Sequence, residues 1–409
     1  MTVMTRERDE GAARSLLGNR NLQIVLALTT TSMLGVGSLS PAFPEIMRDF
    51  HLDTHQVGLL ITVYTAPGIV LSPVAGLLAD RVGRRVVIVT GLIIFALSGL
   101  ACSLSTSYEA LLLFRFIQGL GGSPLSAVNN TVLADLFSGR QRIEALGYNQ
   151  SVSSMSALMH PLVGGAVALF GWQYPMLLPL VALPVAYMVA FRLDGADRAP
   201  TGSLGAYLST AFNGIFTRRV LALYLVNLTN LLVIYGVLLV YLVLMMKERF
   251  EADPLTIGII LATSAMASGL TGMTMRRISA RFSTRQMIVG GMVVSGCAIA
   301  LNALMPGLWW LVIPAVARGL GQGVLMPALY TALAEEAPAD ARAAVMGFAS
   351  TMFRAGQTFG PLVFAGAAAL GGMDAVFHAG GIVLVLTGVF VAFAIGDVDR
   401  EIVRRRTPG

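Results

Sequence analysis

Four ionisable side chains lie well inside long apolar stretches of the chain: Arg115, His160, Arg318 and Arg354, with His378 as a further candidate. An ionisable group is costly to keep inside a membrane-spanning segment, and it generally serves a substrate or ion pathway. Histidine is the side chain whose charge changes near neutral pH, so His160 is a candidate for proton coupling. The Arg354 guanidinium is a candidate substrate contact, with a structural hydrogen bond as the alternative. For Arg318 a structural hydrogen bond is the favoured interpretation.

Carboxylates are absent from the middle of every apolar stretch. The acids nearest to the membrane interior stand close to the ends of stretches, as Glu45 and Asp135 do. The alternative role of His160 is only to fill space between helices. In that case an acid at a helix end must carry the proton, so Glu45 is a further candidate for coupling.

Polar residues that recur inside the apolar stretches are candidates for the wall of a substrate cavity. Amide and hydroxyl groups orient an organic ligand within an otherwise apolar pocket. The candidates are Asn129, Asn130, Asn149, Gln150, Asn227, Asn230, Tyr235, Tyr330, Arg354 and Gln357.

Catalytic chemistry is not indicated by the sequence. We find no nucleophile paired with a base and no cluster of residues with metal-ligand spacing. The two cysteines, Cys102 and Cys297, stand singly in separate stretches. We therefore expect no catalytic residue, no enzyme activity, no metal and no cofactor.

The elements that must position these residues are membrane helices. Apolar residues make up 56% of the 409 residues, charged residues make up 12%, and the mean hydropathy is +0.75. Soluble domains carry about 25% charged residues. Stretches of about 20 apolar residues, enough to cross a bilayer, recur along the whole chain. They lie at about 21–46, 55–79, 86–105, 108–136, 143–169, 173–192, 219–246, 254–279, 286–305, 308–336, 341–369 and 374–396.

The chain also repeats itself at an offset of 200 residues. Leu120-Gly121 recurs as Leu320-Gly321, and Arg85 recurs as Arg285. A repeat unit this long, in so apolar a chain, predicts two homologous membrane bundles. The predicted fold class is therefore an all-α membrane protein, with twelve transmembrane helices in two pseudo-symmetric six-helix bundles.

Basic residues are distributed unevenly along the chain. If both termini are cytoplasmic, 22 of the 28 lysines and arginines fall in cytoplasmic segments, and only Arg48, Lys247 and Arg249 fall in external loops. This asymmetry follows the positive-inside rule and predicts cytoplasmic termini. It accounts for the net charge of +6 without nucleic acid as a partner. We expect a multi-pass protein of the bacterial cytoplasmic (inner) membrane.

The predicted domain boundaries follow the two copies of the repeat. Apolar residues at helical spacing between Leu204 and Phe216 predict an amphipathic helix on the membrane surface, with a soluble linker as the alternative. The first span has no signal-cleavage pattern, so we expect it to stay in the mature protein. The bounds are 1–19 for a cytoplasmic tail, 20–192 for the N-terminal bundle, 193–218 for the linker, 219–396 for the C-terminal bundle and 397–409 for a second cytoplasmic tail.

Two motifs carry a family resemblance. GLLADRVGRR at 76–85 resembles the signature loop of the major facilitator superfamily, and LLLFRFIQGLGG at 111–122 resembles its second motif. The resemblance covers nearly the whole chain and is greatest to the twelve-helix drug:proton antiporter branch. It implies a role for Arg115 in proton coupling, with structural bonding to a neighbouring helix as the alternative. Many exporters of that branch carry an embedded carboxylate, which this chain lacks, so the resemblance leaves the coupling mechanism open.

A proline–glycine motif in the fifth stretch, with a copy in the eleventh, resembles the exporter motif of the same branch. Small residues let membrane helices approach closely, so this motif is expected where the two bundles touch. Ser156 and His160 occupy two positions that are glycine in the antiporters. The expected bundle-contact residues are Gly147, Pro161, Gly164, Gly165, Gly356, Gly360 and Pro361.

The signature loop predicts a conformational latch between the bundles at the cytoplasmic face. A carboxylate at Asp80 can accept from the N-terminal amides of the eleventh helix, because the helix dipole favours a negative charge there. The arginines beside it can pair with Asp135. A purely topological role for these arginines is the alternative. The predicted latch residues are Asp80, Arg81, Gly83, Arg84 and Asp135.

The predicted function is secondary active transport by alternating access. The resemblance implies export of amphipathic organic compounds, such as drugs or metabolites, by proton antiport. The alternatives are an exporter or flippase of lipid-like or siderophore-like anions with Arg354 as the anion contact, a sugar or nutrient facilitator, and a non-transporting receptor. The expected partners are a small-molecule substrate, protons and the lipid bilayer, and we expect a monomer.

Overall fold

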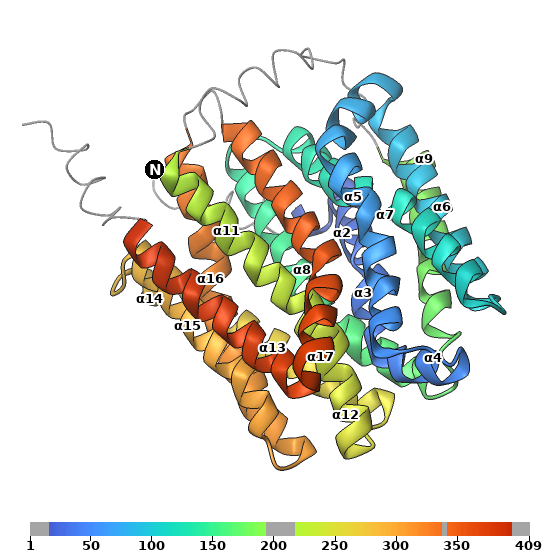
Figure 1. The fold of residues 1–409 in the computed structure, drawn as a ribbon. Helices are drawn as coiled ribbons and strands as arrows, with labels where there is room; N and C mark the ends of the chain where they lie inside the picture. Colours follow the sequence, from blue (N-terminus) through green and yellow to red (C-terminus); the bar gives the residue numbers. More distant parts are fainter. Residues whose placement is uncertain (1–15, 194–216, 338–341, 395–409) are drawn as a thin grey trace, which may run out of the picture.

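The computed structural model describes residues 16–193, 217–337 and 342–394. The regular structure of these residues is helical, and it forms two halves that pack side by side (Figure 1). The first half runs from blue to green in Figure 1, and the second from yellow-green to red. The predicted amphipathic helix between Leu204 and Phe216 lies outside the described residues, as does the C-terminal tail.

The helices of the first half follow the six expected spans. The first span is interrupted, because its helix breaks at Met33 and is completed by shorter segments. The bounds are α2 (Arg20–Ser32), α3 (Leu34–Gly37), η1 (Ser40–Ala42), α4 (Phe43–Asp49), α5 (Thr54–Val82), α6 (Arg84–Ser103), α7 (Tyr108–Leu136), α8 (Gly139–Ala168), η2 (Pro175–Val181) and α9 (Ala182–Arg192).

The second half follows the same plan. Its first span contains a π-helical segment, η3, between two α-helical parts. The bounds are α11 (Arg218–Val233), η3 (Ile234–Leu242), α12 (Val243–Phe250), α13 (Pro254–Met273), α14 (Met275–Ser279), α15 (Thr284–Leu301), η4 (Asn302–Leu304), η5 (Leu308–Leu311), α16 (Val312–Glu336) and α17 (Arg342–Ala394).

Nine helical segments in the described ranges are long and apolar enough to cross a membrane. One of them, Val345–Ala394, covers the last two expected spans. The backbone is non-helical at Gly371 and Gly372, and this break separates the two spans within α17. Gly372 has a φ of 72°, a conformation that suits a residue without a Cβ, so the chain reverses there. Two further long helices, α7 and α8, occupy the fourth and fifth expected spans.

Short polar residues begin several of the helices. The Asn19 side chain accepts from two amides at the start of α2, and Ser107 accepts from the Ala110 amide at the start of α7. Such caps satisfy backbone donors that have no partner within the helix. Gly83, with a φ of 101°, ends α5 and directly precedes α6, so the signature loop forms a tight turn.

The 200-residue repeat is reproduced in the packing of the glycines. A Cβ on Gly119 would overlap the carbonyl oxygen of Tyr64, and a Cβ on Gly319 would overlap that of Ser264. These glycines let the fourth helix of each half lie directly against the second, since small residues allow backbones to touch. The two halves therefore share their internal packing.

Paired contacts also join one half to the other. Gly58 on α5 packs against Pro361 on α17, and Gly258 on α13 packs against Pro161 on α8. Gly258 lies 200 residues after Gly58, and Pro361 lies 200 residues after Pro161. The two contacts are therefore copies of each other with the halves exchanged. The interface between the halves is therefore pseudo-symmetric.

Charged residues hold together the helix ends at the predicted cytoplasmic face. Arg85 donates to the carbonyl oxygens of Ala190 and Leu193 at the end of α9, and its counterpart Arg285 donates to that of Ala392 at the end of α17. Cations are favourable at helix C-termini. Both arginines therefore have a structural role that repeats between the halves.

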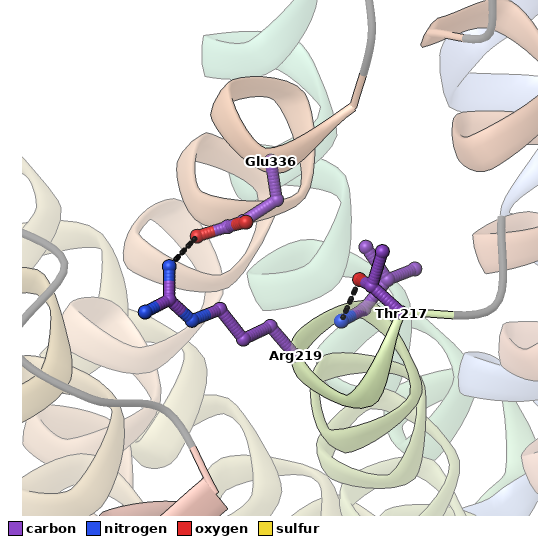
Figure 2. A network of polar contacts seen from close by, with 4 residues as sticks. Thr217, Arg219 and Glu336 are labelled. Atoms are coloured by element: carbon purple, nitrogen blue, oxygen red, sulfur yellow. Dashed lines mark hydrogen bonds and ion pairs between the residues drawn. The ribbon is translucent and has the colours of Figure 1, made fainter. Parts of the chain in front are cut away.

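An ion pair that differs between the halves is shown in Figure 2. At the start of α11, the Thr217 hydroxyl caps the helix, and the Arg219 Nη1 lies 3.4 Å from Glu336 Oε1 at the end of α16. In the first half, Arg84 pairs instead with Asp135 at the end of α7. The residue equivalent to Arg84 in the second half is Thr284, which has no charge. The acid at the end of α16 therefore pairs with an arginine of α11.

Candidate functional site

A cavity of about 510 Å³ lies between the two halves. Its walls come from α2, α5, α7 and α8 of the first half and from η3, α13, α16 and α17 of the second. A volume of this size suits a drug-sized ligand. The cavity therefore stands at the pseudo-twofold axis, where both halves contribute residues.

Close contacts between the halves lie at the predicted external end of the cavity. Near the predicted external end, α8 and α13 touch through Pro161 and Gly258, and α4 contacts α12. Farther along the same two helices, a Cβ on Gly147, Gly269 or Gly272 would have no neighbour within 4 Å among the described residues. The close packing of α8 on α13 is therefore documented at their predicted external ends.

Six of the predicted cavity residues line this space: Asn129, Asn149, Tyr235, Tyr330, Arg354 and Gln357. The prediction is wrong for three others. Asn227 and Asn230 are buried in the second half, where Asn227 donates to the Ala349 carbonyl oxygen and Asn230 to Met326 Sδ. Gln150 is exposed on α8 and does not line the cavity. The Asn130 side chain lies outside the described part of the structure.

A polar cluster joins three helices of the first half at the cavity wall. Asn129 Nδ2 on α7 donates to the Thr29 hydroxyl at 2.7 Å, and that hydroxyl also meets Asn149 Oδ1 on α8. Thr29 was not among the predicted site residues. The signal was present, since Thr29, Ser32 and Met33 follow the spacing of one helix face, and all three line the cavity.

Arg115 does not reach the cavity. Its side chain is 1% exposed and donates through all three nitrogens: Nε to the Leu60 carbonyl oxygen at 3.2 Å, Nη1 to Gln118 Oε1 at 2.7 Å and Nη2 to the Gly35 carbonyl oxygen at 2.9 Å. The guanidinium also lies 4.3 Å from the ring centroid of Tyr64. This geometry matches the structural alternative, in which Arg115 joins α3, α5 and α7.

Arg354 bridges the two halves within the cavity wall. Its Nε lies 3.3 Å from the Ser72 hydroxyl of α5, and its Nη1 donates to Gln357 Oε1 at 3.0 Å on its own helix. The absence of a side chain at Gly68 makes room for it, since a Cβ there would lie 3.0 Å from Arg354 Cδ. Arg354 is therefore part of the α5–α17 interface and is also placed to contact a substrate in the cavity.

His160 lines the cavity on α8 and is 5% exposed. Its Nε2 has no hydrogen-bond partner among the described residues. This nitrogen is buried, so it could take up a proton only in a conformation in which water or substrate reaches it. Glu45 lies on α4 at the predicted external end and does not line the cavity.

The predicted latch is only partly described by the structure. Arg84 and Asp135 form an ion pair, but both belong to the first half, so this pair does not join the two bundles. Arg81 is exposed and Gly83 forms the turn between α5 and α6. The side chain of Asp80 lies outside the described residues, so its contact with α17 stays a prediction.

The prediction that the proline–glycine motif lies between the bundles is wrong for four of its residues. Pro161, Gly165 and Pro361 do contact the opposite half, through Gly258, Pro254 and Gly58 respectively. The other residues lie elsewhere because each faces a different side of its helix. Gly164 packs on Ser38, Gly356 on Leu228 and Leu231, and Gly360 on Leu232 and Gly236, all within their own half. A Cβ on Gly147 would meet no described atom of another segment within 4 Å.

Comparison with known proteins agrees with this architecture. A family model described as Major Facilitator Superfamily matches residues 25–251 and 223–408. The chain belongs to the Major Facilitator Superfamily. It is a multi-pass membrane protein of a transporter family, which agrees with the predicted fold class and the resemblance to drug-efflux members.

Individual members of the Major Facilitator Superfamily match over most of the chain. The class B tetracycline resistance protein of Escherichia coli is 24% identical over 356 residues, covering 85% of this chain and 88% of the relative. Multidrug resistance protein 1 of Bacillus subtilis (strain 168) is 24% identical over 351 residues, covering 84% and 89%. A crystal structure of a POT family transporter in complex with 5-aminolevulinic acid has the same fold, with a TM-score of 0.78, 13% identity and coverage of 92% and 95%.

Proposed function

We propose that this protein exports amphipathic organic compounds from the cytoplasm by alternating access. The observation that carries the proposal is the cavity of about 510 Å³ lined by both halves, with close helix contacts at its predicted external end. Its wall combines apolar side chains of η3 and α13 with amides and hydroxyls, as a site for amphipathic ligands requires. The tetracycline and multidrug resistance proteins it resembles support the same direction of transport.

Alternating access follows from the way the halves meet. The α5–α17 interface holds hydrogen bonds from the Thr62 hydroxyl to the Thr358 carbonyl oxygen and from the Thr358 hydroxyl to the Thr65 hydroxyl. The α8–α13 interface holds close glycine–proline contacts. Rocking the halves about these contacts would open the predicted external side and close the cytoplasmic one.

We further propose that export is coupled to protons, with His160 as the coupling residue. The support is its place on the cavity wall and the unpartnered Nε2. Arg115 would then act only through the packing of the first half. The tail, bundle and linker boundaries predicted from the sequence, a cytoplasmic location of both termini, and a monomeric state belong to the same proposal.

Transport is tested directly in everted membrane vesicles from a host that expresses the protein. An efflux-sensitivity screen of a deletion strain against dyes, antibiotics, lipids and siderophores first identifies a cargo. The cargo should then accumulate in energised everted vesicles and not in vesicles from cells that lack the protein. Loss of cargo from energised everted vesicles would instead indicate uptake and would overturn the export proposal.

A further inference from the structure

Arg318 and Arg115 occupy related places in the two halves but have different surroundings. Arg115 uses all three nitrogens in hydrogen bonds to protein acceptors. Arg318 on α16 makes one hydrogen bond, from Nε to the Ser264 hydroxyl at 3.1 Å. Within the described residues, its two Nη groups have no acceptor and it makes no ion pair.

Arg318 also differs from Arg115 in its access to the cavity. It lines the cavity, and so does Ser264, which orients its guanidinium. A guanidinium carries five N–H donors, of which the protein uses only one here. A cation held in the membrane interior with unused donors is stabilised by an anionic ligand, because charge and hydrogen bonds are then satisfied together.

The charge of the cavity wall favours the same class of ligand. The wall contains Arg318 and Arg354, and none of its described residues is aspartate, glutamate or lysine. A cationic cargo would meet two positive charges without a compensating carboxylate. An anionic cargo would be attracted, and an arginine fork binds a carboxylate through two parallel hydrogen bonds.

Apolar side chains line the same cavity as Arg318. Ile260, Leu261 and Ser264 share one face of α13, and all three line the cavity together with Leu238 and Leu242 of η3. A ligand with a carboxylate on Arg318 would therefore have apolar side chains next to it. This arrangement suits an organic acid with a sizeable apolar body.

We propose that the cargo is an amphipathic organic carboxylate, bound through its carboxylate to Arg318 and through its apolar body to cavity-lining side chains of α13 and η3. The inference rests on the proposed transport function and narrows it to one charge class. Arg354 adds positive potential to the same cavity, while its own hydrogen bonds to Ser72 and Gln357 keep it within the wall.

The test compares an acid with its neutral ester. Dansyl-phenylalanine and its methyl ester share an apolar body and a fluorophore but differ in the carboxylate. Their binding is measured by dansyl emission with the full-length protein in nanodiscs, after subtraction of protein-free nanodiscs. The wild-type protein should bind the acid more tightly than the ester. Arg318→Gln should weaken acid binding by about 10-fold or more, because a hydrogen bond to a charged group contributes about 1.5–3 kcal/mol, and it should leave ester binding unchanged.

Two controls make the outcomes decisive. Unchanged ester binding shows that Arg318→Gln retains a folded cavity, and Arg276→Ala removes an equal charge from the exposed helix α14 without touching the cavity. Equal binding of acid and ester by the wild-type protein would overturn the carboxylate proposal, and so would equal losses for both probes in Arg318→Gln. Energised everted vesicles that accumulate the ester without preferring the acid would retain the export function while removing the proposed charge class.

Discussion

Gly258 packs directly on the carbonyl oxygen of Pro161, so that α13 of the second half meets α8 of the first with no side chain between them. The counterpart contact joins Gly58 to Pro361, where a Cβ on the glycine would lie 3.0 Å from the proline Cβ. Two such contacts, related by the internal repeat, close the cavity at the predicted external end. They make the approach of the halves sensitive to single methyl groups.

We therefore expect Gly258→Val to push α8 and α13 apart and to reduce transport strongly while leaving the fold of each half intact. A Cβ at this position overlaps the backbone of Pro161, which cannot move away as a flexible side chain would. The measurement is transport in everted vesicles together with protein yield. The matched control is Gly269→Val on the same helix, where a Cβ meets nothing within 4 Å. Equal transport in the two variants would contradict the role of this contact.

The three hydrogen bonds of Arg115 predict a structural effect of its removal. Arg115→Ala should lower the free energy of unfolding by about 2–5 kcal/mol, since each bond to a charged donor contributes about 1.5–3 kcal/mol and losses in membranes are smaller. Thermal unfolding in detergent measures this, with Arg276→Ala at an exposed position of α14 as the control. A variant with normal thermal stability but no proton-driven transport would instead support the coupling role that the family resemblance implies.

The predicted orientation in the membrane is testable with single cysteines. In a background where Cys102 and Cys297 are serine, Thr106→Cys should react with an impermeant thiol reagent in intact cells. Ser138→Cys should react only after permeabilisation, because the basic residues place the α7–α8 loop in the cytoplasm. Both of these side chains are exposed in the structure, so a difference between them reports the side of the membrane. The reverse labelling pattern would invert every statement about the two faces.

Proton coupling through His160 predicts a specific loss. His160→Asn keeps a polar side chain of similar size but cannot gain a proton near neutral pH. In proteoliposomes, the variant should still exchange cargo down its gradient and should fail to accumulate it when only a pH gradient is imposed. His378→Asn on an exposed face of α17 serves as the control. Uphill transport by His160→Asn at wild-type stoichiometry would exclude His160 as the coupling site.

The overall architecture was accessible from the sequence because it depends on local composition and on the internal repeat. Span length and hydropathy predict each helix, and the glycines of the repeat occupy equivalent contacts in both halves, as at Gly119 and Gly319. The site was less accessible. Asn129 and Asn149 line the cavity as predicted, whereas Asn227 and Asn230 have the same residue type and a similar sequence context but face the interior of their own half.

The sequence by itself determined the helical spans, the two-bundle plan and the arginines of the membrane interior, because hydropathy and repetition are properties of the chain. Only the tertiary structure decided which of those arginines has unused donors. The break in the first span at Met33 brings the Gly35 carbonyl oxygen to Arg115 and completes its hydrogen bonds. Among the described residues, Arg318 donates a hydrogen bond to Ser264 alone and otherwise faces the cavity. That difference arises from contacts between helices that are distant in the chain. Neither the spacing nor the type of a residue predicts which acceptor its side chain will meet on another helix.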